Sequence, residues 1–80
     1  MTTMTCQLDE KQKSALRALH FWRKNLLVST RHQDISECKK SRIAIVHLFK
    51  YCDHLKIPYK VQNKVIYAAT QDVAFHDLTI

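Results

Sequence analysis

Residues 8–28 read LDEKQKSALRALHFWRKNLLV, and the spacing of their apolar side chains decides the fold of this chain. Each residue of an α-helix turns the chain by about 100°, so side chains that recur at threes, fours and sevens share one side. The side chains with this spacing are Leu8, Ala15, Leu19, Trp22 and Leu26. The stretch therefore predicts an amphipathic helix over residues 8–28, with Thr5 as its N-cap and this apolar seam in the core.

The opposite side of the same helix is basic. Its stripe consists of Lys13, Arg17, His20, Lys24 and Arg31. Acidic side chains are usually interspersed on a solvated helix face as i,i+4 partners, but none lies within this stripe. Two interpretations stay open: an ordinary solvated face, or a surface that binds phosphates. Phe21 lies off the seam, where it either packs on the third segment or belongs to an exposed contact patch.

Residues 35–55 predict a second helix, which Asp34 caps together with Glu37. Thr30 with Gln33 has the same spacing, so an earlier start stays open. The connection VSTRHQD (28–34) has the short length that makes neighbouring helices antiparallel. On a helical wheel, a broad core side carries Cys38, Ile45, Leu48, Phe49, Cys52 and Leu55. The outer side carries Ser36, Lys40, His47, Lys50 and His54, with Ile43 in their midst. Lys40 and Lys50 thus extend the basic surface, and Ile43 with Phe21 is a candidate protein contact.

A third helix is predicted over residues 59–72, after Pro58, from the pattern of Val61, Val65, Ala68 and Ala69. Its start carries Lys60, Gln62, Asn63 and Lys64, which are residue types that read bases or contact phosphates in a major groove. The alternative for these four is a polar solvated face. For the tail, residues 73–80, three alternatives stay open: a short strand, a fraying helix, or an extended tail packed on the core.

Catalytic and metal chemistry find little support in the sequence, although VHLFKYCDHLK (46–56) is rich in reactive residue types. Cys52 lies on the core side of the helix, whereas His47 and His54 lie on the other side. These histidines are also two turns apart, about 10 Å along the axis, which is too far for both to bind one zinc. The chain has no glycine, which phosphate-binding loops and nucleophile elbows require. We therefore expect no catalytic residue, metal or cofactor, and no enzyme.

The composition favours one small all-α domain. The chain has 80 residues, no glycine and one proline, which predicts a bundle of about three helices over residues 1–80. We expect an antiparallel helical hairpin plus a shorter third helix, with residues 1–7 flexible. The three cysteines lack paired spacing, which favours a reducing cytoplasmic location. No apolar run approaches the roughly 18 residues that span a membrane, so no membrane partner is expected.

The charge indicates the kind of partner. Thirteen Lys and Arg against seven Asp and Glu give a formal net charge of +6, which favours an anionic partner. We expect a regulator that acts on nucleic acid or on a complex that handles it, with contacts from Lys13, Arg17, His20, Lys24, Arg31, Lys40, Lys50 and Lys64. The alternative is a protein-interaction module, such as an inhibitor or adaptor of phage or mobile-element origin, that docks through Phe21 and Ile43 without touching nucleic acid. Because so short a chain has a small core, a homodimer is a further expectation.

Overall fold

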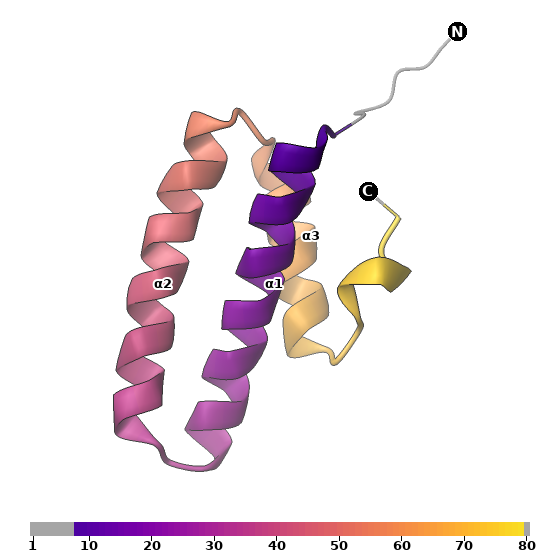
Figure 1. Ribbon diagram of the computed structural model, residues 1–80. Helices are drawn as coiled ribbons and strands as arrows, with labels where there is room; N and C mark the ends of the chain where they lie inside the picture. The colour runs from indigo at the N-terminus through magenta and orange to yellow at the C-terminus, as the bar shows by residue number, and fades with distance from the viewer. Residues whose placement is uncertain (1–7, 80) are drawn as a thin grey trace, which may run out of the picture.

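The protein is a bundle of three helices, seen in a computed structural model that describes residues 8–79 (Figure 1). The helices are α1 (Glu10–Arg31), α2 (Ile35–His54) and α3 (Tyr59–Thr70), followed by a short 3₁₀ turn, η1 (Phe75–Asp77). Helices α1 and α2 form an antiparallel hairpin, and α3 returns beside α1. The predicted all-α class, with a hairpin and a shorter third helix, is confirmed. The prediction that residues 1–7 are flexible lies outside the described residues, and the predicted cap Thr5 is wrong because Asp9 is the N-cap of α1.

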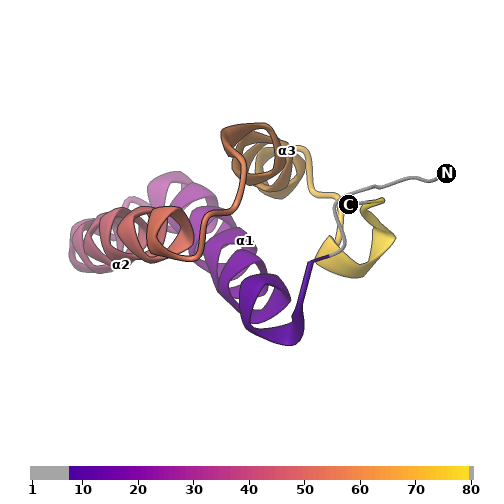
Figure 2. The ribbon, with the colours of Figure 1, turned by 90° about the horizontal axis from the view of Figure 1, so that it is seen from above.

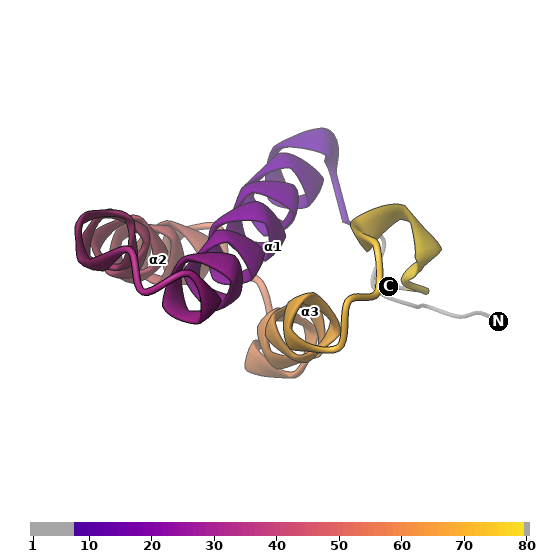
Figure 3. The same ribbon diagram turned by 90° about the horizontal axis from the view of Figure 1, so that it is seen from below.

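Helix α1 is the centre of the bundle. Views from the two ends show α1 between α2 and α3, which pack on different sides of it (Figures 2 and 3). Because α1 is covered on two sides, both Leu16 and Leu19 are completely buried. The seam predicted from the sequence contained Leu19 but not Leu16. The remaining buried members of the core cluster are Ala15, Ile45, Cys52, Ile57 and Val65.

A capping box fixes the start of α1. The side chain of Asp9 accepts a hydrogen bond from the backbone N–H of Gln12 at 2.8 Å, and Gln12 Oε1 accepts one from the backbone N–H of Asp9 at 3.0 Å. This reciprocal pair satisfies two donors that a helix start leaves free. The helix therefore begins at Glu10, two residues later than predicted.

The start of α2 is the predicted one. Asp34 accepts a hydrogen bond from the backbone N–H of Glu37 at 3.1 Å, as an N-cap does. The Glu37 carboxylate does not complete a capping box; its Oε1 instead accepts from Asn25 Nδ2 of α1 at 3.2 Å. The same amide nitrogen donates to the buried Ser41 hydroxyl at 2.8 Å. The cap and the hairpin contact are thus built from the same turn of α2.

The helices end without glycine. One residue beyond the C-cap of each helix has a positive φ: 55° at Gln33, 61° at Lys56 and 61° at Asp72. At the end of α2, Lys56 N donates to Asp53 O at 3.0 Å and Ile57 N donates to Cys52 O at 3.1 Å. This is the Schellman arrangement, whose left-handed position glycine usually occupies. The chain therefore stops its helices with residues that carry a conformational cost at that position.

Replacing Lys56 with glycine is expected to stabilise the protein by about 1 kcal/mol, because glycine adopts the left-handed conformation without a steric cost. In a domain of this size the midpoint of thermal unfolding should rise by roughly 4–8 °C, which circular dichroism can measure. The matched control is Lys50→Gly, the same change inside α2, which should destabilise by about 1 kcal/mol. An unchanged or lower midpoint for Lys56→Gly would contradict the strained helix end.

The C-terminal segment folds back over α1. Asp72 turns the chain, Val73 N donates to Ala68 O at 2.9 Å, and η1 follows. Phe75 and Leu78 are half-buried and pack against the core. Of the alternatives for the tail, the extended segment packed on the core is confirmed, with one 3₁₀ turn in it. The strand and the fraying helix are wrong, because the turn at Asp72 ends α3 and directs the tail onto α1.

Candidate functional site

The basic stripe of α1 is partly covered by the C-terminal segment. His20, predicted as a contact residue, is only 8% exposed. Its Nε2 lies 2.7 Å from the carbonyl oxygen of Val73, and since a carbonyl can only accept, Nε2 carries the proton and donates. The His20 ring also meets the ring of Phe75 edge to face, with centroids 6.0 Å apart. The prediction that His20 lies on an open contact surface is therefore wrong, because the tail passes over it.

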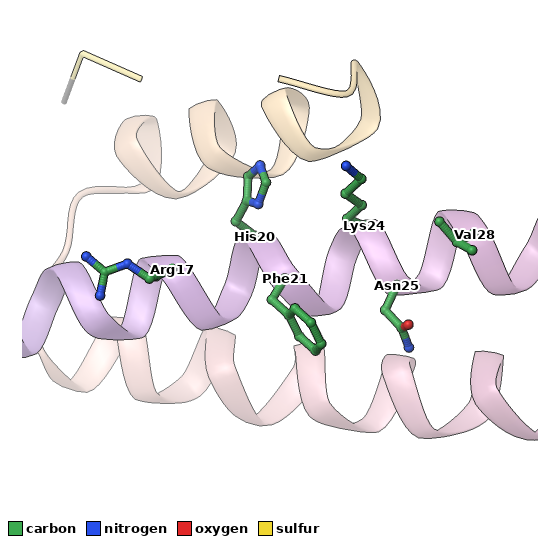
Figure 4. A pocket seen from close by; sticks show the side chains of 6 residues that line it. All are labelled: Arg17, His20, Phe21, Lys24, Asn25 and Val28. Carbon is green, nitrogen blue, oxygen red and sulfur yellow. The ribbon is translucent and has the colours of Figure 1, made fainter. Parts of the chain in front are cut away.

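Two further cations of the stripe have partners in the same segment. Lys24 Nζ lies 2.8 Å from Asp72 Oδ1, and this hydrogen bond with the lysine charge lowers the pKa of the Asp72 carboxyl. The Arg17 guanidinium lies over the ring of Phe75, 5.4 Å from its centroid, within the range of a cation–π contact. His20 and Lys24 point toward the chain of α3 and its extension (Figure 4). A phosphate at Lys24 would lie beside a carboxylate.

The other predicted cations are spread over all three helices. Lys40 pairs with Glu37 of its own helix at 3.5 Å, and Lys64 Nζ donates to the carbonyl of Thr79 at 2.6 Å. Lys13 is half-buried. Arg31 and Lys50 are exposed and form neither an ion pair nor a side-chain hydrogen bond within residues 8–79. The structure thus does not gather the eight predicted residues into one phosphate-binding surface.

Phe21 and Ile43 are both exposed, but they do not line the same depression. Phe21 is 60% exposed, lies edge to face on Trp22 with centroids 5.3 Å apart, and points away from α3 (Figure 4). It lines a shallow depression of about 380 Å³ formed by α1 side chains, including Arg17 and Val28. Ile43 is 53% exposed on α2 and does not line this depression. Of the alternatives for Phe21, the exposed position is confirmed and packing on the third segment is wrong.

The reactive residue types of α2 are separated, as the helical wheel predicted. Cys52 is completely buried, and its pKa is raised by burial and then by the charge of Asp53, which makes its thiol a poor nucleophile. His47 and His54 are exposed on the other side of the helix. Across residues 8–79, no three His, Cys, Asp or Glu side chains lie close enough together to hold a metal ion.

At the start of α3, Gln62 does not share the exposed side of Lys60, Asn63 and Lys64. Gln62 is completely buried, and its Nε2 donates to the carbonyl of Ile57 at 2.9 Å and to Asp53 Oδ1 at 3.2 Å. The prediction that this amide faces outward with Lys60, Asn63 and Lys64 is therefore wrong. Gln62 instead binds the backbone of the turn between α2 and α3, which the sequence pattern did not indicate.

A groove runs along α2, which the sequence did not predict. Its first part is a depression of about 370 Å³ between the three helices, with an almost entirely apolar lining. That part is lined by Arg23 and Leu26 of α1, Arg42, Ile45, Val46 and Phe49 of α2, and Ile66 of α3. A second depression of about 520 Å³ adjoins it at Arg42, and is lined by Thr30, Gln33, Ile35, Cys38, Lys39 and Arg42. We call the two together the α2 groove.

Sequence reasoning missed the α2 groove because the helical wheel assigned Ile45 and Phe49 to a closed core. The available signal was Arg42, Val46 and Phe49, spaced by four and three residues on one side of α2, together with the exposed Ile35. Helix α3 packs mainly on α1 and contacts α2 very little, so this side of α2 is covered only in part. No acidic side chain lines either part of the groove.

No protein-family model matches this chain, and neither a curated protein nor a solved structure similar to it is found. None of the helices in residues 8–79 is both long and apolar enough to cross a membrane.

Proposed function

We propose that this chain is a non-enzymatic binding protein, an adaptor or regulator that docks on a larger protein through α2. The observation that supports the proposal is the mixed character of the exposed side of α2. Three aliphatic side chains are 82%, 53% and 52% exposed there, among cations that form no ion pair within residues 8–79. The aliphatic residues are Ile35, Ile43 and Val46, and the cations are Lys39, Arg42 and Lys50.

A protein partner explains this surface better than phosphates do. Phosphate contacts come from cations, polar side chains and backbone N–H groups, and do not require aliphatic side chains. Removing apolar surface from water stabilises a complex by about 25 cal/mol per Å², which a protein partner can provide. Arginine is also among the residue types enriched in protein interfaces. The partner we propose is therefore a protein with an acidic and apolar face, which can still belong to a complex that handles nucleic acid in the cytoplasm.

Direct binding to nucleic acid is the second candidate, supported by the net charge of +6 and by the unpaired Arg31 and Lys50. Affinity of this kind comes from released counterions and grows with the number of neutralised phosphates. Lys24 and Lys40 already face carboxylates at 2.8 and 3.5 Å, which lowers the number of cations available for phosphates. This reduction makes nucleic acid the weaker candidate.

Site-specific photocrosslinking in source cells separates the two candidates. A photoreactive phenylalanine derivative in place of Ile43 should give a discrete protein adduct that survives nuclease treatment. The same group in place of Asn63, which is exposed on α3, is the matched control and should give none. Adducts that disappear with nuclease, together with duplex binding that falls steeply between about 50 and 200 mM salt and is lost in Arg31→Glu with Lys50→Glu, would replace the protein proposal with the nucleic-acid one.

A further inference from the structure

We infer that the α2 groove binds an amphipathic helix of the partner, with an apolar ridge in the groove and acidic side chains along both edges. This inference rests on the proposed function and deepens it, because it names the element of the partner and its charge. The inference comes from three features of the groove: its length, the arrangement of its apolar lining, and the sign of the charges at its edges.

The groove is long and straight enough for a helix. It follows α2 from Ile35 to Phe49, which at 1.5 Å per residue is about 20 Å, or roughly four helical turns. Its α1 side is a single stripe, with Arg23, Leu26 and Thr30 spaced by three and four residues. A groove lined by helical stripes is the usual receptor for the apolar face of an amphipathic helix, which inserts side chains at every third or fourth position.

The apolar lining is accessible. Val46 is 52% exposed, while Leu26, Phe49 and Ile66 are partly buried around it and pack on the core beneath. Toward the start of α2 the groove opens beside Ile35, which is 82% exposed. An apolar ridge laid along this line would therefore cover side chains that water now contacts.

The charged side chains at the edges of the groove are all basic. Arg23 belongs to α1, and Lys39 and Arg42 belong to α2, so cations approach the groove from two helices. No carboxylate lines the groove, and none of the three cations forms an ion pair within residues 8–79. Guanidinium groups bind carboxylates in a bidentate manner, which favours Glu and Asp on the flanks of the bound helix.

A second copy of this chain fits the groove less well. Each copy carries a net charge of +6, so two copies repel each other, and the exposed side of α2 is itself basic. A partner helix with acidic flanks meets no such repulsion. Complementary charge at the edges fixes the orientation of the helix, while the apolar ridge supplies most of the affinity.

Selection from a peptide display library tests this inference with the full chain as bait. The library holds helical peptides of about 16 residues with fixed apolar positions at threes and fours, and flanking positions drawn from Glu, Gln and Lys. We expect Glu to be enriched on both flanks. Binding of the selected peptide should shift the amide resonances of Leu26, Val46 and Ile66, and exchanging its Glu for Lys should weaken binding by about 10- to 100-fold.

Charge-reversal variants of the chain complete the test. Arg23→Glu with Arg42→Glu should switch the selected flanks from Glu to Lys, whereas Lys60→Glu, on the exposed side of α3, should leave the selection unchanged. Peptides without a charge preference, or resonance shifts away from the groove, would overturn the inference. So would concentration-dependent shifts of the same residues in the chain alone, which would assign the groove to a second copy. Nuclease-resistant adducts from Ile43 would show that the proposed function stands even if this inference fails.

Discussion

Leu19→Ala is expected to remove a large part of the stability of the protein. Leu19 is completely buried in α1, the helix that both other helices contact. Truncating a buried leucine to alanine costs about 2–5 kcal/mol, from lost burial and from the cavity left behind. A domain of 80 residues has a free energy of unfolding of roughly 4–12 kcal/mol. The midpoint of thermal unfolding should therefore fall by roughly 10–30 °C.

Urea and thermal unfolding followed by circular dichroism measure this loss. Ile43→Ala is the matched control, because it removes an aliphatic side chain of equal size from a position that is 53% exposed. It should change the free energy of unfolding by no more than about 0.5 kcal/mol. If both variants lost the same small amount, α1 would not be the central helix of the core.

Local patterns predicted the parts of the fold that depend on one helix alone. The apolar spacing predicted the helices α1 and α2, the short connection between them predicted the antiparallel hairpin, and Asp34 predicted the start of α2. The assignment of Cys52 to the core, and of His47 and His54 to the outside, followed from the same periodicity. A helical wheel succeeds here because each of these side chains faces either a single neighbouring helix or water.

The wheel fails where a second partner packs on the same helix. The sequence of α1 shows one apolar seam and one basic stripe, but α3 and the C-terminal segment cover part of that stripe. His20 and Leu16 are buried for this reason. The direction of the tail depends on Asp72, which has a left-handed backbone conformation. A glycine at this position would have indicated such a conformation in the sequence, but an aspartate does not.

The candidate site was the least predictable part, because the α2 groove exists only between helices. Arg23 and Arg42 belong to different helices, 19 positions apart in sequence, and come to the same groove through the packing of the hairpin. The lining residues Val46 and Ile35 stay exposed because α3 packs mainly on α1 and contacts α2 very little. The sequence did indicate that Ile43 is anomalous on a polar face, and the structure leaves it exposed on α2, outside the lining of the groove.

The buried amide of Gln62 supplies the second large effect that we expect. Its Nε2 binds the carbonyl of Ile57 and the carboxylate of Asp53, and so connects the start of α3 to the turn that precedes it. Gln62→Glu keeps the shape of the side chain but replaces the donor with an oxygen. At neutral pH the introduced carboxylate would face Asp53 and a carbonyl oxygen in a buried position. Leaving such a charge unpaired should cost about 3–5 kcal/mol.

The pH dependence of this variant distinguishes charge from packing. Burial and the neighbouring Asp53 raise the pKa of the introduced carboxyl in the folded state above its unfolded value of about 4.3. Above that value the folded state binds more protons than the unfolded state, so the free energy of unfolding should fall as the pH rises from about 4 toward 7. Urea unfolding at several pH values measures the slope relative to the unsubstituted protein. Asn63→Asp, the exposed neighbour, should show no such slope, and an equal loss for Gln62→Glu at every pH would mean that the amide serves packing alone.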